Sequence, residues 1–260
     1  MVSAIITHWR YAWLVAASSI AGVMNAMAGG GSFLSFPAML GVGVLPIQAN
    51  ATNTVALWPG QLTSVAALRG DMRKDLLPAI CIASAIGGVS GAVILLHTHQ
   101  ITFLHLIPWL LLGATVLFGL SGPVSRWIRR RSATPHAEHA ISPWLVFLAL
   151  LPICFYIGYF GAGGGFLVMT ALALFGVEEM HTLNSMKVLA ACLSNLSAVL
   201  TFVLTGAIVW KYCVVSMLFA GTGGYIGAQY ARRMNPQMLR GIVVTTGCLV
   251  AAYFFWRNGL

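Results

Sequence analysis

Long apolar runs constrain this chain more than any other feature of its sequence. Eight runs of about 20 residues are each long enough to cross the hydrocarbon core of a membrane as a helix. Of the 260 residues, 59% are hydrophobic and 7% are charged, against about 25% charged in an ordinary soluble domain. So little polar surface cannot cover a water-soluble globule, and the sequence therefore predicts an all-α polytopic membrane protein. The runs are 10–28, 49–69, 75–97, 101–120, 143–162, 182–205, 211–231 and 237–257.

The basic residues indicate orientation in the membrane rather than nucleic-acid binding. The chain has 14 Lys and Arg against 5 Asp and Glu, but the basic residues stand in short clusters between the apolar runs. Such clusters mark cytoplasmic loops, so we expect no nucleic-acid partner. The five cysteines stand singly inside apolar runs and form no metal-ligand spacing. The sequence therefore predicts neither a metal site nor a cofactor.

Two halves of the chain repeat one pattern, which predicts a tandem duplication. The segment 28–31 (AGGG) corresponds to 162–165 (AGGG), and the GxxxG pattern at 87–91 corresponds to the one at 223–227. An extended hydrophilic segment with four arginines lies between the halves. We therefore expect a first transmembrane repeat over residues 1–120, a basic cytoplasmic linker over 121–142 and a second transmembrane repeat over 143–260.

Each repeat is predicted to hold four long transmembrane helices and one short helix that is broken by glycines. The short runs, 32–45 and 166–177, directly follow the glycine triplets. Five spans per repeat, with the short run crossing, would make the repeats inverted, and four spans would make them parallel. The positive-inside rule does not decide between these schemes, although both place the loop at 69–75 and the linker in the cytoplasm. Inverted repeats are favoured, because two broken helices usually face each other near the midplane in that way.

The glycine triplets have two interpretations. Glycines allow close helix packing, and they also permit the positive φ angles that a break in a helix requires. In the second interpretation each break uncovers backbone N–H groups, and the short helix that follows points its positive N-terminus at the same place. The two breaks would then bind an anion. The candidate residues are Gly29, Gly30, Gly31, Gly163, Gly164 and Gly165.

Polar side chains recur at helical spacing after each short run, so that one face of the following helix is polar. Hydrogen bonds between helices would explain some of these side chains. A shared substrate cavity would explain why they are concentrated on one face. The candidate substrate-binding residues are Asn50, Thr52, Asn53 and Gln61 in the first repeat and Asn184, Ser185, Lys187, Ser194 and Asn195 in the second.

Lys187 lies well within a predicted span, whereas the other Lys and Arg residues lie at or near loops and helix ends. A charge inside the membrane is costly and marks a candidate functional site. The alternative is that Lys187 extends its ammonium group to the membrane surface, because it lies only a turn or two from the start of its helix.

These features resemble the sulfite exporter TauE/SafE family of membrane transporters. The resemblance rests on two halves that each have a Gly-rich break, a short apolar helix and then a similar helix start, ATNT at 51–54 and NSMK at 184–187. It covers nearly the whole chain, and it implies a multi-pass transporter of the bacterial inner membrane that is not an enzyme. It also implies export of small sulfur-containing or organic anions. The chain departs from the pattern at 184–185 and at Pro59, which is expected to break its helix without a counterpart in the second half.

The sequence thus predicts a transporter that exports a small oxyanion, such as sulfite or an organosulfonate like sulfoacetate, through a site between the two broken helices. The alternative is a permease for another solute class, such as a metal cation. Proton and cation carriers usually present carboxylates within the membrane, but the acidic residues here fall in loops or at helix ends. For that reason we also expect transport without a coupled proton or sodium ion. The expected partners are the small anion and the lipid bilayer, and a homodimer is left open.

Overall fold

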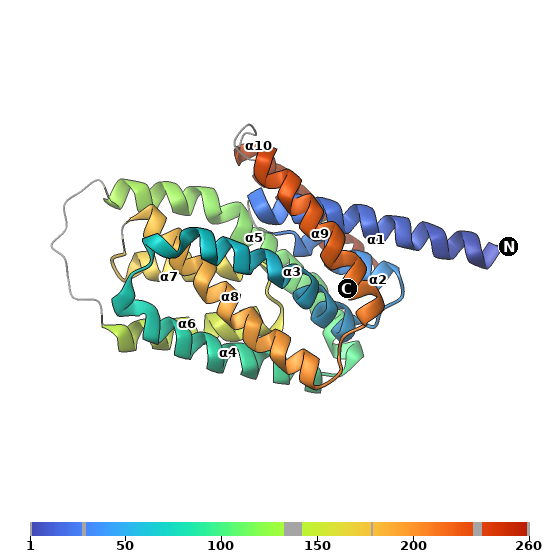
Figure 1. Ribbon diagram of the computed structural model, residues 1–260, viewed down its shortest axis with the longest axis horizontal. Coiled ribbons are helices and arrows are strands. Elements are labelled where there is room, and N and C mark those ends of the chain that lie inside the picture. The colour runs from blue at the N-terminus through green and yellow to red at the C-terminus, as the bar shows by residue number, and fades with distance from the viewer. Residues whose placement is uncertain (1, 28–29, 133–141, 178, 231–235, 259–260) are drawn as a thin grey trace.

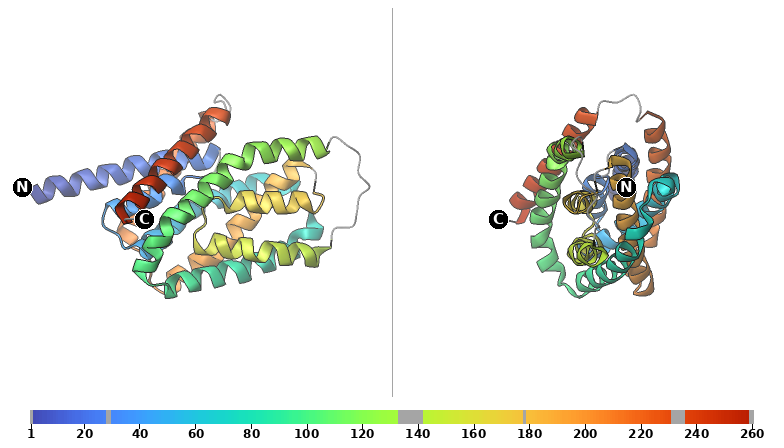
Figure 2. Two further views of the ribbon diagram at one scale, coloured as in Figure 1. Left: turned by 180° about the vertical axis from the view of Figure 1, so that it is seen from behind. Right: turned by 90° about the vertical axis from the view of Figure 1, so that its left-hand side faces the viewer.

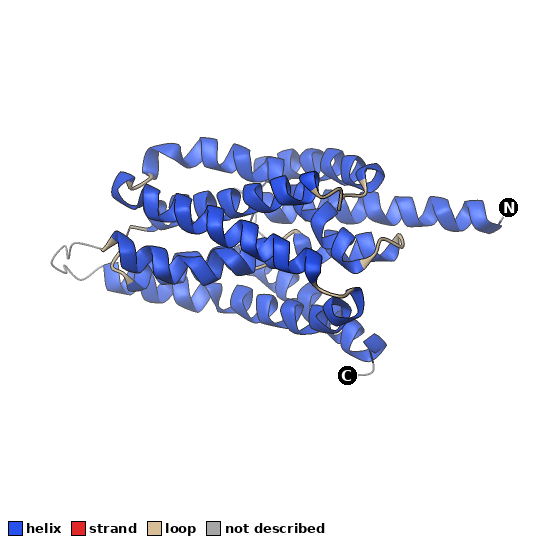
Figure 3. Ribbon diagram, turned by 90° about the horizontal axis from the view of Figure 1, so that it is seen from below, coloured by secondary structure: helices blue, strands red, loops and turns tan. Residues whose placement is uncertain are grey.

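The computed structural model describes residues 2–27, 30–132, 142–177, 179–230 and 236–258, and these residues form helices joined by loops (Figures 1 and 3). Each apolar run is helical, so the all-helical prediction is confirmed. The α-helices are α1 (Val2–Met27), α2 (Ser32–Gly41), α3 (Pro46–Leu68), α4 (Leu77–His97), α5 (Gln100–Ser132), α6 (Pro143–Tyr159), α7 (Gly164–Leu174), α8 (Met180–Leu204), α9 (Trp210–Tyr230) and α10 (Pro236–Asn258). Two 3-10 turns, η1 (Arg69–Asp71) and η2 (Lys74–Leu76), connect α3 to α4.

Prolines and glycines explain several helix boundaries. α3, α4 and α6 each have a proline in their first turn, where the missing N–H has no intrahelical partner to lose. The chain leaves α2, α7 and α8 through Gly43, Gly176 and Gly206, all of which have positive φ. A glycine in this conformation is a common end to a helix, because a side chain would be strained there.

Two local expectations differ from the structure. Pro59 does not break its helix, since α3 runs without interruption from Pro46 to Leu68. Neighbouring groups in a membrane protein can satisfy the backbone that a proline frees, and Pro is therefore tolerated inside such helices. The second difference concerns the segment 121–142, because α5 continues through it as far as Ser132. Most of the remaining segment, residues 133–141, lies outside the described residues.

The short helices α2 and α7 run back along the helices that precede them. A Cβ on Gly31 would meet the backbone of Ala21, and a Cβ on Gly41 would approach the Trp13 ring, so α2 is antiparallel to α1. Figures 1 and 2 show the same arrangement for α6 and α7, and the two hairpins approach the middle of the molecule from opposite ends. Each short helix therefore returns toward the end of the molecule from which the preceding helix came, and its 10 or 11 residues rise only about 15–17 Å, about half of the hydrocarbon core. Each glycine break forms the tip of a hairpin.

Small residues bring two pairs of helices into close contact. Gly87 and Gly91 of α4 lie against the backbone of α6 between Cys154 and Tyr159. Gly223 and Gly227 of α9 lie in the same way against α1 between Ser19 and Val23. The central helices α3 and α8 also pack together, and the Trp58 indole N–H of α3 donates to the Cys192 carbonyl of α8 at 3.1 Å. The GxxxG patterns are therefore explained by helix packing.

The outer surface of the bundle is apolar. Large hydrophobic side chains such as Ile82, Ile94, Leu200 and Leu249 are exposed on several helices, which suits a lipid environment. Among the described residues, three helical segments are long and apolar enough to cross a membrane: Lys74–His97, Gln100–Val124 and Met180–Leu204.

Candidate substrate site

The two hairpin tips meet in the middle of the molecule. Gly30 in the first tip has a φ of 98°, and Gly161 and Gly163 in the second have φ values of 83° and 76°. Only glycine takes such angles readily, so the glycines are needed where the chain reverses. At the start of each short helix the first turn closes on its own tip, because Phe33 N–H donates to the Gly30 carbonyl and Phe166 N–H to the Gly163 carbonyl, both at 3.1 Å.

A cavity of about 70 Å³ lies between the tips. This volume would hold a small ion or a few water molecules, since one water molecule needs a cavity volume of at least ~10–15 Å³. Amide and hydroxyl side chains contribute to its wall from four helices, together with backbone from the second tip. The lining residues are Asn25 of α1; Gly30 and Ser32 at the start of α2; Thr54, Leu57 and Gln61 of α3; Phe160, Gly161, Ala162 and Gly163 of the second tip; and Asn195 of α8.

Two of the predicted polar residues meet at the cavity wall. Asn195 Nδ2 donates to Gln61 Oε1 at 3.0 Å, which leaves the two amide N–H donors of Gln61 for other partners. Thr54 donates its hydroxyl to the Asn50 carbonyl of its own helix at 2.9 Å. The cavity thus presents neutral polar groups, and no carboxylate is among the described residues that line it.

Other predicted residues hold helices together instead of lining the cavity. Asn50 Nδ2 donates to the Tyr159 carbonyl at the end of α6, at 3.0 Å. Thr52 Oγ1 accepts from the Val209 N–H at 3.0 Å, and the Ser185 hydroxyl lies 2.9 Å from the Asp71 carbonyl. These hydrogen bonds fix the position of the second tip, the start of α9 and the η1 turn, respectively.

Two further candidates are buried away from the cavity wall. Asn53 is buried, and its Oδ1 has no hydrogen-bond partner among the described residues. A buried polar atom of this kind usually has a bound water or ligand as its partner. Ser194 is fully buried, with its backbone against Gly88 of α4.

Lys187 lies between the cavity and the linker end of the fold. It lies eight positions before Asn195 on α8, which corresponds to about 12 Å along the helix axis. Its Nζ is 5.5 Å from the centroid of the Phe166 ring, and its aliphatic carbons lie beside Gly165. The side chain is half-buried, and no described carboxylate forms an ion pair with it. A lysine held only by an aromatic face remains available to an anion.

The structure therefore brings together part of the predicted site. Gly30, Gln61, Gly163 and Asn195 line the cavity, whereas Gly29 lies outside the described residues. Gly31, Gly164 and Gly165 lie next to the lining glycines in the tips, and the half-buried Asn184 belongs with Lys187 to the linker end of α8. Asn50, Thr52 and Ser185 lie in contacts between helices or turns, and Asn53 and Ser194 are buried away from the cavity wall.

Sequence reasoning missed some of the lining. Asn25 and Ser32 flank the first triplet, and Phe160, Gly161 and Ala162 precede the second. Asn25 had a signal, since it is a polar residue among the apolar residues of the last two turns of α1. No signal in the sequence indicated Phe160 and Leu57, because apolar residues are common throughout the chain.

A helical membrane protein with a small polar cavity between two glycine-broken hairpins has the architecture of a membrane transporter. The chain belongs to the sulfite exporter TauE/SafE family, whose model matches residues 14–254. This is a family of membrane transporters and not of enzymes.

Several bacterial proteins are similar to the chain over most of both lengths. The probable membrane transporter protein ORF9 of Sinorhizobium sp is 29% identical, over 92% of this chain and 90% of its own length. YfcA of Escherichia coli strain K12, a probable membrane transporter protein, is 24% identical over 92% and 87%. A probable membrane transporter protein of Haemophilus influenzae is 25% identical over 92% of each. No solved structure matches the chain.

Proposed function

We propose that the protein exports a small oxyanion, such as sulfite or an organosulfonate, across the bacterial inner membrane through the cavity between the hairpin tips. The observation that carries the proposal is the cavity wall, which combines the amides of Asn25, Gln61 and Asn195 with glycine backbone. An oxyanion that has lost its water needs hydrogen-bond donors in return, and amides and backbone N–H groups supply them. The name of the family, sulfite exporter, supports the same substrate class.

A metal cation is the less suitable substrate for this cavity. Hard cations prefer oxygen ligands with carboxylates among them, and softer ones prefer histidine or thiolate. No group of three or more His, Cys, Asp or Glu side chains that could hold a metal ion occurs in the part of the chain that the structure describes. The neutral lining therefore supports the anion over the cation.

The two halves are proposed to be inverted repeats, related by a pseudo-two-fold axis in the membrane plane. Exchanging α1–α5 with α6–α10 in order turns the α1–α9 contact into the α6–α4 contact and leaves the α3–α8 contact unchanged. The same exchange turns the α2–α10 contact into the α7–α5 contact. Each half would then contribute one hairpin and three crossing helices. An odd number of crossings inverts the second half relative to the first.

This arrangement defines a proposed topology. The end of α5, the start of α6 and the loop at 69–75 lie at one end of the molecule, and the start of α1 and the end of α10 lie toward the other (Figure 1). Because four arginines stand in the segment 121–142, the positive-inside rule favours a cytoplasmic linker. The termini are then outside. The α6–α7 hairpin and Lys187 on α8 are on the cytoplasmic side, from which an exported anion comes.

Transport by the purified protein in proteoliposomes tests this function. We expect saturable uptake of labelled sulfite or sulfoacetate above that of empty liposomes, with thiosulfate and sulfate as competitors that rank the substrates. A parallel assay with divalent cations examines the alternative. Cation uptake without uptake of any of the four anions would replace the anion proposal by the cation permease.

A further inference from the structure

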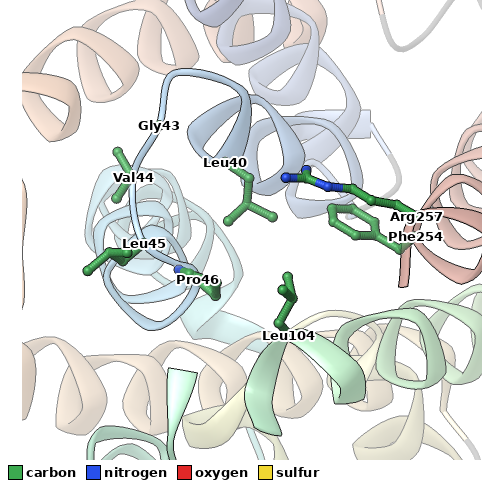
Figure 4. A pocket seen from close by; sticks show the side chains of 8 residues that line it. All are labelled: Leu40, Gly43, Val44, Leu45, Pro46, Leu104, Phe254 and Arg257. Atoms are coloured by element: carbon green, nitrogen blue, oxygen red, sulfur yellow. The ribbon is translucent and has the colours of Figure 1, made fainter. Parts of the chain in front are cut away.

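A second cavity, of about 240 Å³, lies at the end of the molecule that carries the chain termini (Figures 1 and 4). Three segments that are far apart in sequence form its wall. These are the end of α2 with the loop that follows it, the beginning of α5 and the end of α10. Leu40, Val44, Leu104 and Phe254 make most of this wall apolar. The cavity is therefore larger than the central one and of a different chemical character.

Arg257 is the charged residue among those that line this cavity. Figure 4 shows its side chain reaching from α10 toward Leu40, beside the ring of Phe254. The residue is exposed, and no described carboxylate forms an ion pair with it. A guanidinium group is planar and presents several N–H donors, which suits the oxygens of a phosphate.

Tryptophans place the cavity at the membrane surface. Trp256 precedes Arg257 and is 83% exposed, and Trp13 lies against Gly41 near the end of α2 and is 49% exposed. Tryptophan is enriched where the hydrocarbon core meets the headgroups. The apolar wall would thus lie beside lipid tails, with Arg257 at the level of lipid phosphates.

We infer that this cavity binds one phospholipid with an anionic headgroup, whose acyl chain lies against the apolar wall and whose phosphate lies on Arg257. The apolar wall of the cavity suits the acyl chain of a phospholipid, and Arg257 suits its phosphate. A small free oxyanion would meet a single cation in an apolar surrounding, which does not replace its water. The bound lipid would join the loop after α2 to α5 and α10, and so would hold the α1–α2 hairpin in place.

Lipid binding can be measured without transport, so its outcome is independent of the proposed substrate. The purified full chain in detergent is titrated with dioleoylphosphatidylglycerol or dioleoylphosphatidylcholine, and native mass spectrometry counts the bound lipids. We expect one phosphatidylglycerol to bind more tightly than phosphatidylcholine. Arg257→Gln should weaken the binding of phosphatidylglycerol by about fivefold, as expected for one basic residue at an anionic surface. It should weaken the binding of phosphatidylcholine less, because the choline group offsets the charge of the phosphate.

Two controls distinguish the contribution of the lipid headgroup from that of the acyl chains. Arg69→Gln removes an exposed arginine at the opposite end of the molecule and should leave the affinity for both lipids unchanged. Glycerol phosphate, which has the headgroup charge without acyl chains, should not compete. Equal affinity of wild type and Arg257→Gln for phosphatidylglycerol, or full competition by glycerol phosphate, would overturn the inference. Because Arg257 is exposed, its substitution is expected to leave the fold intact.

Discussion

Asn195 of α8 and Gln61 of α3 form a hydrogen bond of 3.0 Å at the wall of the central cavity. Each belongs to the helix that follows one of the two hairpins, so a single contact joins both halves of the chain at the proposed substrate site. The same helices are also joined by the Trp58 indole and the Cys192 carbonyl. Any sliding of α8 along α3 would therefore change the donors that the cavity offers.

A negative charge in this wall should prevent anion transport. At about 4 Å and an effective dielectric constant of 20, two like charges repel by ~4 kcal/mol, so Asn195→Asp should weaken anion affinity about a thousandfold. Asn195→Gln keeps a neutral amide and should retain activity within an order of magnitude. Concentration-dependent uptake into proteoliposomes measures both. Unchanged anion affinity in correctly inserted Asn195→Asp protein would remove the cavity from the transport path.

Lys187 should contribute to anion affinity even though it does not line the cavity. Its ammonium group contacts only the Phe166 ring in the described contacts, and it lies on the side from which an exported anion approaches. Lys187→Gln should raise the half-saturating concentration by about 10- to 150-fold, which is the value of a charge-assisted hydrogen bond of ~1.5–3 kcal/mol.

Lys211 supplies a matched control for this substitution. It is also a lysine over aromatic rings, 5.0 Å from the Tyr11 centroid, but it is exposed near the start of α9. Lys211→Gln should have little effect on the half-saturating concentration. Small and equal effects of both substitutions would favour the interpretation in which Lys187 extends to the membrane surface.

Close packing of α4 on α6 should make Gly91 intolerant of a side chain. A Cβ at this position would collide with backbone atoms of Phe155 and Tyr159, whereas a Cβ on Gly113 of α5 would meet nothing within 4 Å. Overpacking typically costs ~1–3 kcal/mol, so Gly91→Ala should lower the thermal midpoint of the purified protein and Gly113→Ala should not. A midpoint that is equally insensitive to both would show that the α4–α6 contact has room to adjust.

The proposed topology predicts which positions an impermeant thiol reagent can reach. In a variant with the exposed Cys81 and Cys248 replaced by alanine, a cysteine at Ser142 should be protected in intact cells and labelled after permeabilisation. A cysteine at Arg10 should be labelled in intact cells, because the N-terminus is placed outside. Labelling of both positions from the same side would support parallel repeats instead.

Export should follow the membrane potential without a pH or sodium gradient. The central cavity has no carboxylate among its described lining residues, and carboxylates are the usual proton carriers within membranes. A potential of 100 mV is worth about 2.3 kcal/mol per charge, so a dianion that leaves a negative interior gains ~4.6 kcal/mol, over a thousandfold in gradient. Potassium diffusion potentials in liposomes measure this dependence, and an absolute requirement for a proton or sodium gradient would contradict it.

Helix positions could be read from the sequence because they depend on local composition. The run 182–205 became α8 over Met180–Leu204, and the short run after the second triplet became α7. An apolar segment of sufficient length must satisfy its backbone internally in a membrane, and a helix does so without reference to the rest of the chain. The continuation of α5 to Ser132 was less apparent, because polar residues there are compatible with either a helix or a loop.

By itself, the sequence determined the class of protein, the two glycine breaks and a polar face on the helices that follow them. Tertiary structure alone decided which members of that face line a cavity and which join helices. Asn50 and Asn195 are both polar residues after a short run, yet Asn50 donates to the end of α6 while Asn195 lies in the cavity wall. The reason is that helical spacing fixes only the face on which a side chain stands. Its partner depends on the rotation and depth of each helix, which the packing of α4 on α6 and of α1 on α9 establishes.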